Sequence, residues 1–254
     1  MAHYTQKKNF GALIIGDEIL SGKRKDKHFE KIIALLAKRG LDLSWSMYLP
    51  DDPVLITTVL KSTISKGDVT FSFGGIGATP DDHTRQCAAD AIGVPLILHP
   101  DAKKEIEAVF GKDAYPKRIL MGVFPRGASI IPNPYNRIPG FSIGNHHFLP
   151  GFPVMAWPML EWLLDNRYRY QHFLSPDVSF SINVEDAGES QLIDLMRTFE
   201  ELYSSYKIFS LPTLTKTGRR IELGIKGPQS DAQKAFNFLK EGVTELGFKW
   251  KLNQ

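Results

Sequence analysis

Residues 69 to 84 read Val-Thr-Phe-Ser-Phe-Gly-Gly-Ile-Gly-Ala-Thr-Pro-Asp-Asp-His-Thr. The apolar run Val69–Phe73 predicts a buried strand, and a helix is expected from about Asp82 to Ile92. Glycines between a strand and a helix let the backbone approach an anion closely, and the helix adds the positive end of its dipole. The stretch therefore predicts a phosphate-binding turn. The alternative is a strand-to-helix connection that uses glycine only for its backbone angles.

Strands and helices alternate on the amino-terminal side of this turn. Phe10–Ile15 and Leu41–Leu49 are expected as strands. Apolar residues recur at helical spacing from Asp26 to Arg39, and Gly40 follows where a helix C-cap belongs. The sequence Pro50-Asp51-Asp52-Pro53 opens another helix, because aspartate caps free amides and proline suits the first turn. This alternation predicts a sheet with helices on both faces.

The pattern changes twice on the carboxyl-terminal side. Prolines and glycines crowd Pro125–Pro153, which predicts short strands and tight turns, including a hairpin around Gly144-Asn145. Beyond Asn166 the periodicity predicts strands and helices in the order βαββαβ, which is the ferredoxin-like arrangement. We therefore expect two domains, over residues 1–166 and 175–254, with a polar linker between them.

The composition favours a protein of a reducing compartment without nucleic-acid or membrane partners. The 31 basic and 28 acidic residues give a formal charge of only +3 and form no long run of either sign. The single cysteine, Cys87, excludes an internal disulfide and a multi-cysteine metal cluster within one chain. Met1–Asn9 lacks the apolar core of a secretory signal, and no stretch approaches the roughly 20 apolar residues that span a bilayer. We expect a cytoplasmic location.

Further motifs accompany the glycine turn in a fixed order. Gly74–Thr84 matches Gly-Gly-x-Gly-x-Thr-x-x-Asp-x-Thr, and Gly16–Gly22 matches Gly-[Asp/Thr]-Glu-[Ile/Leu]-Leu-x-Gly. Pro132–Pro134, Ile138–Phe141 and Leu149–Pro153 follow. Together these motifs resemble the molybdopterin-binding family, which includes MogA, MoaB and the amino-terminal domain of CinA. The later ones are similar to the CinA branch and to the related domain of eukaryotic FAD synthases.

The resemblance implies an α/β fold, a three-layer αβα sandwich with a mostly parallel sheet, followed by the small α+β ferredoxin-like domain. It places the ligand site at the carboxyl ends of the strands, where amides of the glycine turn receive phosphate. Members of the family commonly assemble as dimers or trimers, so we expect a homo-oligomer. The expected partner is a phosphorylated small molecule, a pterin or a nucleotide diphosphate.

The resemblance also implies the site residues. Asp51 and Asp82 match the carboxylates of MogA-like enzymes and are the candidate catalytic residues, with Asp82 as candidate metal ligand. Carboxylates beside a phosphate call for Mg²⁺ or another divalent metal to offset the charge. The alternatives are structural, because Asp51 or Asp52 would cap a helix and Thr84 would be a plain helix residue. The candidate ligand-binding residues are Gly16, Asp17, Glu18, Ser21, Gly74, Gly75, Ile76, Gly77, Ala78, Thr79 and Thr84.

Histidines occur at two places that the family motifs do not explain. CinA-like sequences carry Asn-x-Asn or Asp-x-Asn before the first long helix, whereas this chain has Asp26-Lys27-His28. We expect His28 at the surface, at the start of that helix; the alternative is that it binds a phosphate as a cation. His146 and His147 are adjacent on an expected strand and should point to opposite faces, so they cannot easily ligate one metal.

Two function hypotheses follow from the resemblance. The first is a metal-dependent hydrolase of a nucleotide or pterin diphosphate, such as ADP-ribose or FAD. The second is a non-catalytic module that binds molybdopterin or a similar phosphorylated heterocycle. Release of AMP from such diphosphates distinguishes the two.

Overall fold

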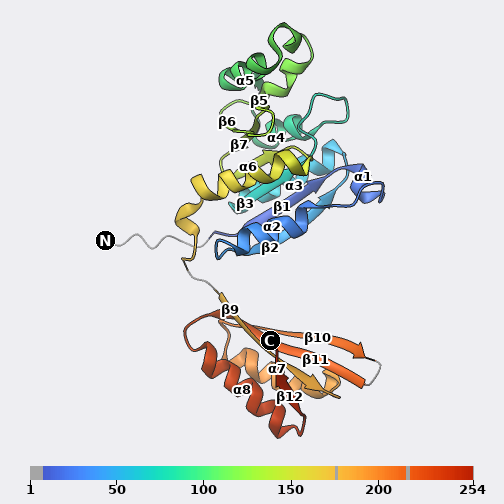
Figure 1. The fold of residues 1–254 in the computed structure, drawn as a ribbon, viewed down its shortest axis with the longest axis vertical. Helices are drawn as coiled ribbons and strands as arrows, with labels where there is room; N and C mark the ends of the chain where they lie inside the picture. The colour runs from blue at the N-terminus through green and yellow to red at the C-terminus, as the bar shows by residue number, and fades with distance from the viewer. Residues whose placement is uncertain (1–7, 175–176, 216–217, 254) are drawn as a thin grey trace, which may run out of the picture. The chain divides into compact units, whose positions relative to one another are not determined.

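The computed structural model describes residues 8–174, 177–215 and 218–253. The chain divides into two compact units, Met1–Leu174 and Ser175–Gln254, which are considered separately (Figure 1). The first unit includes the segment after Asn166, because Tyr168 is buried in its core and the Phe173 amide donates to the Arg39 carbonyl at 3.0 Å. Within the described part of the chain, no helix has both the length and the apolar character needed to cross a bilayer.

The first unit is built on a six-stranded sheet with the order β2-β1-β3-β8-β7-β6. β2, β1, β3 and β8 run parallel to one another, and β7 and β6 are antiparallel to their neighbours. The register aligns Ile15 with Leu49 and Phe73 with Leu149, so the four parallel strands end at one edge. The strands are β1 (Phe10–Ile15), β2 (Leu43–Leu49), β3 (Val69–Phe73), β6 (Ser129–Ile131), β7 (Gly140–Ile143) and β8 (His146–Leu149).

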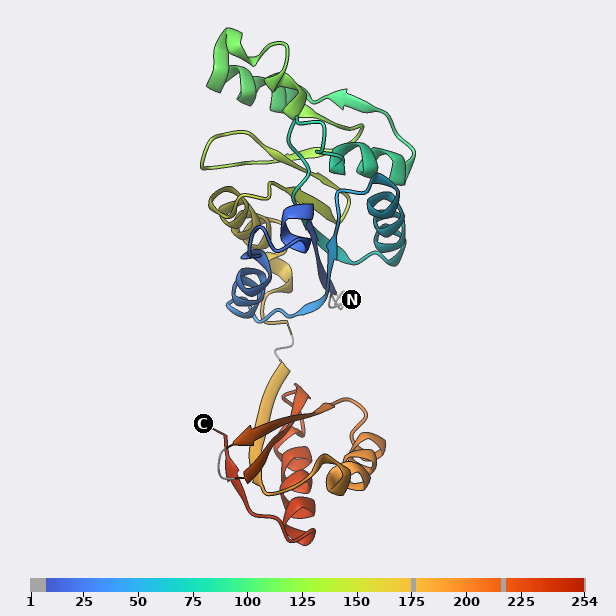
Figure 2. The same ribbon diagram turned by 90° about the vertical axis from the view of Figure 1, so that its right-hand side faces the viewer.

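Helices cover both faces of this sheet. Figure 2 shows α2 (His28–Ala37) and α6 (Pro153–Asn166) on one face, and α3 (Pro53–Lys66) and α4 (Thr84–Ile92) on the other. Each pair encloses a separate apolar core with the sheet. A single turn, α1 (Asp17–Leu20), follows β1. The expected α/β fold with a mostly parallel central sheet is therefore confirmed.

A small lobe, formed by the residues between α4 and β6 in the sequence, completes the first unit. It contains α5 (Pro100–Phe110) and the antiparallel pair β4 (Leu96–Leu98) and β5 (Val123–Pro125). Short 3-10 turns occupy Gly111–Ala114 and Arg118–Gly122, and a third, Arg169–Gln171, follows α6. The proline-rich region carries the expected hairpin, since β7 and β8 pair around Gly144 with Ile143 opposite His146.

The second unit has the expected ferredoxin-like order. Its antiparallel sheet has the order β10-β11-β9-β12, and Ile182, Leu223 and Leu239 are fully buried in its core. The separate small antiparallel domain is therefore confirmed. The elements are β9 (Asp177–Glu185), α7 (Glu189–Leu202), β10 (Lys207–Thr215), β11 (Gly218–Pro228), α8 (Ala232–Glu245) and β12 (Trp250–Leu252).

The adjacent histidines of β8 lie on opposite faces of the sheet, as the strand pattern predicts. His146 Nε2 lies 2.9 Å from Thr63 Oγ1 of α3, whereas His147 Nε2 lies 2.6 Å from the Tyr168 hydroxyl. Burial lowers the pKa of His146 to about 4 and that of His147 to about 3. Both rings are therefore neutral in the folded protein at ordinary pH, where their ring nitrogens serve as hydrogen-bonding groups.

We expect acidification to destabilise the first unit through these two rings. Each has a pKa near 6.5 when unfolded, so its stabilisation is complete above that pH and is lost as the pH falls toward the folded values. Between pH 7 and 5.5 the free energy of unfolding should fall by about 1 kcal/mol for each histidine. Denaturant unfolding at both values measures this loss. His146→Gln should reduce this loss by about 1 kcal/mol, the share of one ring. An undiminished loss would contradict the role of His146.

Candidate functional site

The glycine turn after β3 is fixed by hydrogen bonds to two neighbouring elements, β8 and α4, and lies close against a third, β1. The Gly74 amide donates to the Leu149 carbonyl at 3.0 Å. Thr84 donates twice, from its amide to the Gly75 carbonyl at 3.0 Å and from Oγ1 to the Gly74 carbonyl at 3.1 Å. Gly74 has φ 105°, and a Cβ there would collide with the Ile15 carbonyl. A side chain would therefore push the turn away from β1.

Several amides of this turn have no acceptor within the protein. Of the residues that the structure describes, Gly75, Ile76, Gly77 and Ala78 donate no backbone hydrogen bond to a protein group. All four line a cleft of about 530 Å³ at the edge where the parallel strands end. Successive free amides beside a helix N-terminus form an arrangement suited to an anion.

Asp82 closes the glycine turn. Its Oδ2 accepts from the Thr79 amide at 2.8 Å and from Thr79 Oγ1 at 2.5 Å, and the Asp82 amide donates to the Thr79 carbonyl at 3.0 Å. A Cβ on Gly77 would collide with the same carboxylate. Asp82 and Thr79 both line the cleft. One carboxylate oxygen of Asp82 thus holds the turn together, and Oδ1 is left for other contacts.

Arg85 stabilises the glycine turn by hydrogen bonds to backbone carbonyls. The sequence motifs do not indicate this role. Its Nη2 donates to the Gly77 carbonyl at 2.6 Å, and its Nη1 donates to the Val123 carbonyl at 3.2 Å. Burial lowers the pKa of Arg85, with the Asp82 charge opposing this effect. The guanidinium ties the turn to the end of the α5 lobe and is absent from the lining of the cleft.

Acidic residues form a second wall of the cleft. Asp17 and Asp51 brace each other, because the Asp17 amide donates to Asp51 Oδ2 at 3.0 Å and the Asp51 amide donates to Asp17 Oδ1 at 3.2 Å. Asp51 and Glu18 line the cleft, whereas Asp17 does not. Partial burial raises the pKa of Asp51, and the negative charges of Asp17, Glu18 and Asp81 raise it further.

The helix cap belongs to Asp52, not to Asp51. Asp52 Oδ1 accepts from the Val54 amide at 2.8 Å and from the Leu55 amide at 2.9 Å. This arrangement satisfies the start of α3 and leaves Asp51 to the cleft. The two adjacent aspartates, which the sequence left interchangeable, therefore have different structural roles.

The donor set suits a divalent metal that is shared with a ligand. Across the described residues, no group of three or more His, Cys, Asp or Glu side chains is arranged to hold a metal ion. Magnesium is commonly bound by one or two carboxylates together with substrate phosphates and water. Asp82 fits this limited role, because its carboxylate lines the cleft beside the glycine turn and its Oδ1 accepts no hydrogen bond from the described residues.

The remaining wall is largely apolar. Phe152 lies on it with 56% of its surface exposed, although it is a large aromatic residue. Asn133 stabilises this wall, donating from Nδ2 to Asn136 Oδ1 at 2.8 Å and to the Ile138 carbonyl at 2.9 Å. The apolar lining residues are Phe110, Met121, Ile138, Pro139, Pro150, Phe152 and Met155. A flat heterocycle matches such a surface.

The expectation of a surface position for His28 is wrong. Only 5% of His28 is exposed, and its ring stacks on Phe73 with centroids 4.5 Å apart. Its Nε2 lies 3.1 Å from the Gly151 carbonyl, and burial lowers its pKa. The first turn of α2 packs against the end of β3, which covers the ring. His28 thus fixes Gly151, which lies against Gly74.

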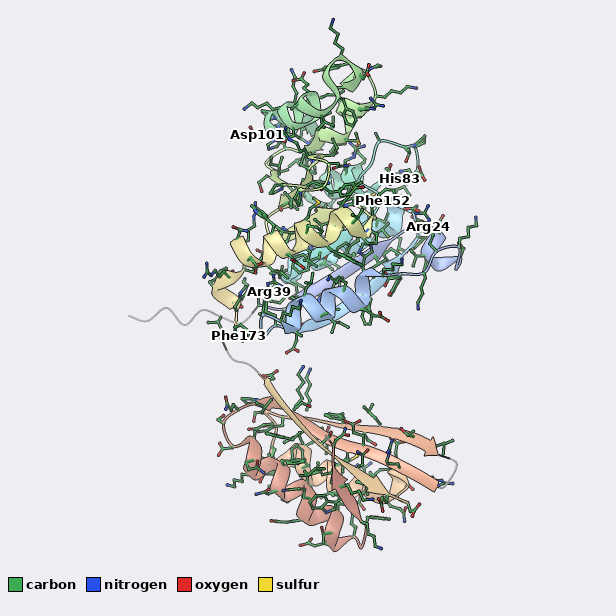
Figure 3. The ribbon with its side chains drawn as sticks, viewed as in Figure 1. Arg24, Arg39, His83, Asp101, Phe152 and Phe173 are labelled. Atoms are coloured by element: carbon green, nitrogen blue, oxygen red, sulfur yellow. The ribbon has the colours of Figure 1, made fainter. Side chains whose placement is uncertain are left out.

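The structure brings together most of the predicted site residues and adds others. Gly16, Glu18, Asp51, Asp82 and the glycine turn line the cleft. Ser21 is exposed at the end of α1 and does not line it, and Thr84 is fully buried behind the turn. Arg24, absent from the motifs, also lines the cleft. Figure 3 shows Arg24, His83 and Phe152 at the same end of the first unit.

Comparison with known proteins places these features in a family. A family model described as "Probable molybdopterin binding domain" matches residues 11–170. A CinA-like protein of Syntrophotalea carbinolica is 34% identical over 160 residues, which is 60% of this chain but 39% of that protein. A CinA-like protein of Anaeromyxobacter dehalogenans is 32% identical with the same coverage. The chain thus spans well under half the length of these relatives.

A solved structure agrees over the same region. The protein CinA from Thermoplasma acidophilum, whose structure is described as having unknown function, is 28% identical. The match covers 63% of this chain and 98% of that one, with a TM-score of 0.57. The fold of the first unit is therefore shared with a CinA protein.

We expect Thr84→Val to lower the free energy of unfolding by about 1–3 kcal/mol, because the buried Gly74 carbonyl loses its hydroxyl donor. Thr58→Val is the matched control, since Thr58 donates to the Val54 carbonyl in an exposed part of α3. That change should stay within about 0.5 kcal/mol. Chemical denaturation measures both, and equal effects would show that Thr84 does not tether the turn.

Proposed function

The chain belongs to the CinA-like molybdopterin-binding domain family, and from that membership we propose that its cleft binds a phosphorylated pterin or nucleotide and hydrolyses ADP-ribose or FAD-type diphosphates. The observation that carries the proposal is the row of free amides from Gly75 to Ala78 facing the same cleft as the Asp51 carboxylate. Such a site holds a phosphoryl group at one wall and presents a base at another.

The free amides bind one phosphoryl group. Their dipoles need no reorganisation when the ligand arrives, because the turn is already fixed through Asp82, Thr84 and Arg85. Fixed donors also stabilise the additional negative charge that develops on phosphoryl oxygens during attack. Binding and transition-state stabilisation therefore rest on the same groups.

Asp51 accepts the proton of the attacking water. The water oxygen forms a bond to phosphorus, the bond from phosphorus to the bridging oxygen breaks, and two phosphate monoesters result. A carboxylate whose pKa lies above its ordinary value is a stronger proton acceptor, and burial among acidic neighbours raises the pKa of Asp51. Asp17 holds the Asp51 side chain in place through its amide.

A divalent metal, Mg²⁺ or another, would be held by Asp82 with phosphate oxygens, and it would offset the charge of the phosphates, while Asp51 stays available as the base. Without such compensation, the acidic wall of Glu18, Asp51 and Asp81 repels the ligand. The apolar wall with Phe152 receives the heterocycle, whether adenine, flavin or molybdopterin.

The second candidate function is a non-catalytic module that binds molybdopterin or a similar compound. One observation favours it. Both candidate catalytic carboxylates accept hydrogen bonds from the protein, Asp51 from the Asp17 amide and Asp82 from Thr79. Such bonds rigidify a binding site even when no reaction follows. The homo-oligomer and the cytoplasmic location stay predictions.

The test is AMP release from ADP-ribose or FAD in the presence of Mg²⁺ or Co²⁺. We expect turnover, and we expect a metal chelator to abolish it. Asp51→Asn should reduce the turnover rate by roughly 100-fold or more, because 100-fold is the lower end of the usual effect of losing a general base. Asp82→Asn should abolish turnover as well. Asp52→Asn is the matched control, because asparagine caps a helix as well as aspartate and Asp52 does not line the cleft.

Two results would count against hydrolysis. Equal turnover in Asp51→Asn and Asp52→Asn would remove Asp51 from the reaction. No AMP from any diphosphate, together with saturable binding of the same compounds, would favour the binding module. Absence of both turnover and binding would overturn the phosphate site itself.

A further inference from the structure

One cationic side chain lines the acidic cleft. Of the described residues around it, Arg24 is the only lysine or arginine, and it shares the lining with Glu18, Asp51, Asp81 and Asp82. A guanidinium beside several carboxylates ordinarily forms an ion pair with one of them. Whether Arg24 does so determines whether it is available to a ligand.

The Arg24 side chain is unpaired. Across the part of the chain that the structure describes, its guanidinium takes part in no hydrogen bond or ion pair, although Glu18 lines the same cleft. Its backbone, in contrast, is fixed. The Arg24 amide donates to the Glu18 carbonyl at 2.9 Å, and the Gly22 amide donates to the Ile19 carbonyl at 3.1 Å. The loop thus holds a free cation at a defined place.

The loop with Arg24 and the glycine turn follow neighbouring strands. β1 leads into the α1 loop, β3 leads into the glycine turn, and the two strands pair in parallel. Figure 3 shows Arg24 and Phe152 at the same end of the first unit. Arg24 therefore faces the cleft from a different loop than the amides of Gly75–Ala78.

We propose that Arg24 binds the second phosphoryl group of a diphosphate ligand whose first phosphoryl group is held by the glycine-turn amides. This rests on the proposed function. The amides suit one anionic group, and a guanidinium offers paired donors that match a second set of phosphate oxygens. Arg24 thereby selects diphosphates over monophosphates, and the acidic residues leave it free for this role.

The neighbouring lysines provide matched controls. Lys23 and Lys25 flank Arg24, carry the same charge and are exposed, but neither lines the cleft. A general effect of positive charge on anion binding would therefore appear equally in all three positions. A specific contact would appear in Arg24 alone. Because the Arg24 side chain has no partner among the described residues, its replacement should leave the melting temperature unchanged.

The experiment measures binding by calorimetry with Mg²⁺ present. The probes are AMP and an ADP-ribose analogue with a methylene group between its phosphorus atoms, which resists hydrolysis. We expect Arg24→Gln to weaken binding of the analogue by about tenfold or more, which is the scale of one charge-assisted contact. Binding of AMP should weaken by less than about threefold. Lys23→Gln should change both affinities by less than about threefold.

The outcomes separate this proposal from the one on which it rests. If the wild-type chain binds neither probe, both fail. If it binds the analogue and Arg24→Gln binds it equally well, the role of Arg24 is overturned while the phosphate site stands. Equal weakening of both probes, or an equal effect of Lys23→Gln, would reduce Arg24 to a general electrostatic contribution and overturn its selectivity.

Discussion

The close approach of the glycine turn to β1 is the constraint on which the site depends. No side chain fits between Gly74 and the Ile15 carbonyl, and the Thr84 hydroxyl satisfies the Gly74 carbonyl within the protein. The Gly74, Gly75 and Gly77 carbonyls and the flanking Gly74 and Thr79 amides are hydrogen-bonded, which fixes the turn. Among the described residues, the amides of Gly75–Ala78 have no acceptor, and these residues line the cleft. Rigid, unpaired donors at the end of a parallel sheet can bind an anion without a cost in reorganisation of the backbone.

The acidic residues of the cleft lie in the same cavity as these amide donors. Carboxylates alone would repel a phosphate group. Amides alone would bind it but would provide no base to activate a water molecule. Both lie in one cleft, where burial and acidic neighbours raise the pKa of Asp51 and Asp82 Oδ2 accepts from Thr79. In the proposed function, these carboxylates face the phosphoryl group that the amides bind. A metal shared with the ligand, and the free guanidinium of Arg24, supply the compensating positive charge in the account proposed here.

Local patterns predict the fold better than the finer details of the site. β1 and β3 match their expected bounds, since short buried strands depend on the residues within them. The burial of His28 escapes prediction, because it depends on packing between α2, Phe73 and Gly151, which are distant in sequence. The division of roles between Asp51 and Asp52, and the support from Arg85, likewise appear only when separate loops meet.

Anion binding by the glycine turn can be followed at the backbone amides themselves. Titrating the ¹⁵N-labelled chain with a phosphorylated ligand such as AMP or ADP-ribose, and recording amide chemical shifts, reports each donor separately. We expect saturable shifts that are largest for Gly75, Ile76, Gly77 and Ala78, whose amides have no protein acceptor among the described residues. Saturable binding that shifts other amides and leaves these four unchanged would contradict this expectation.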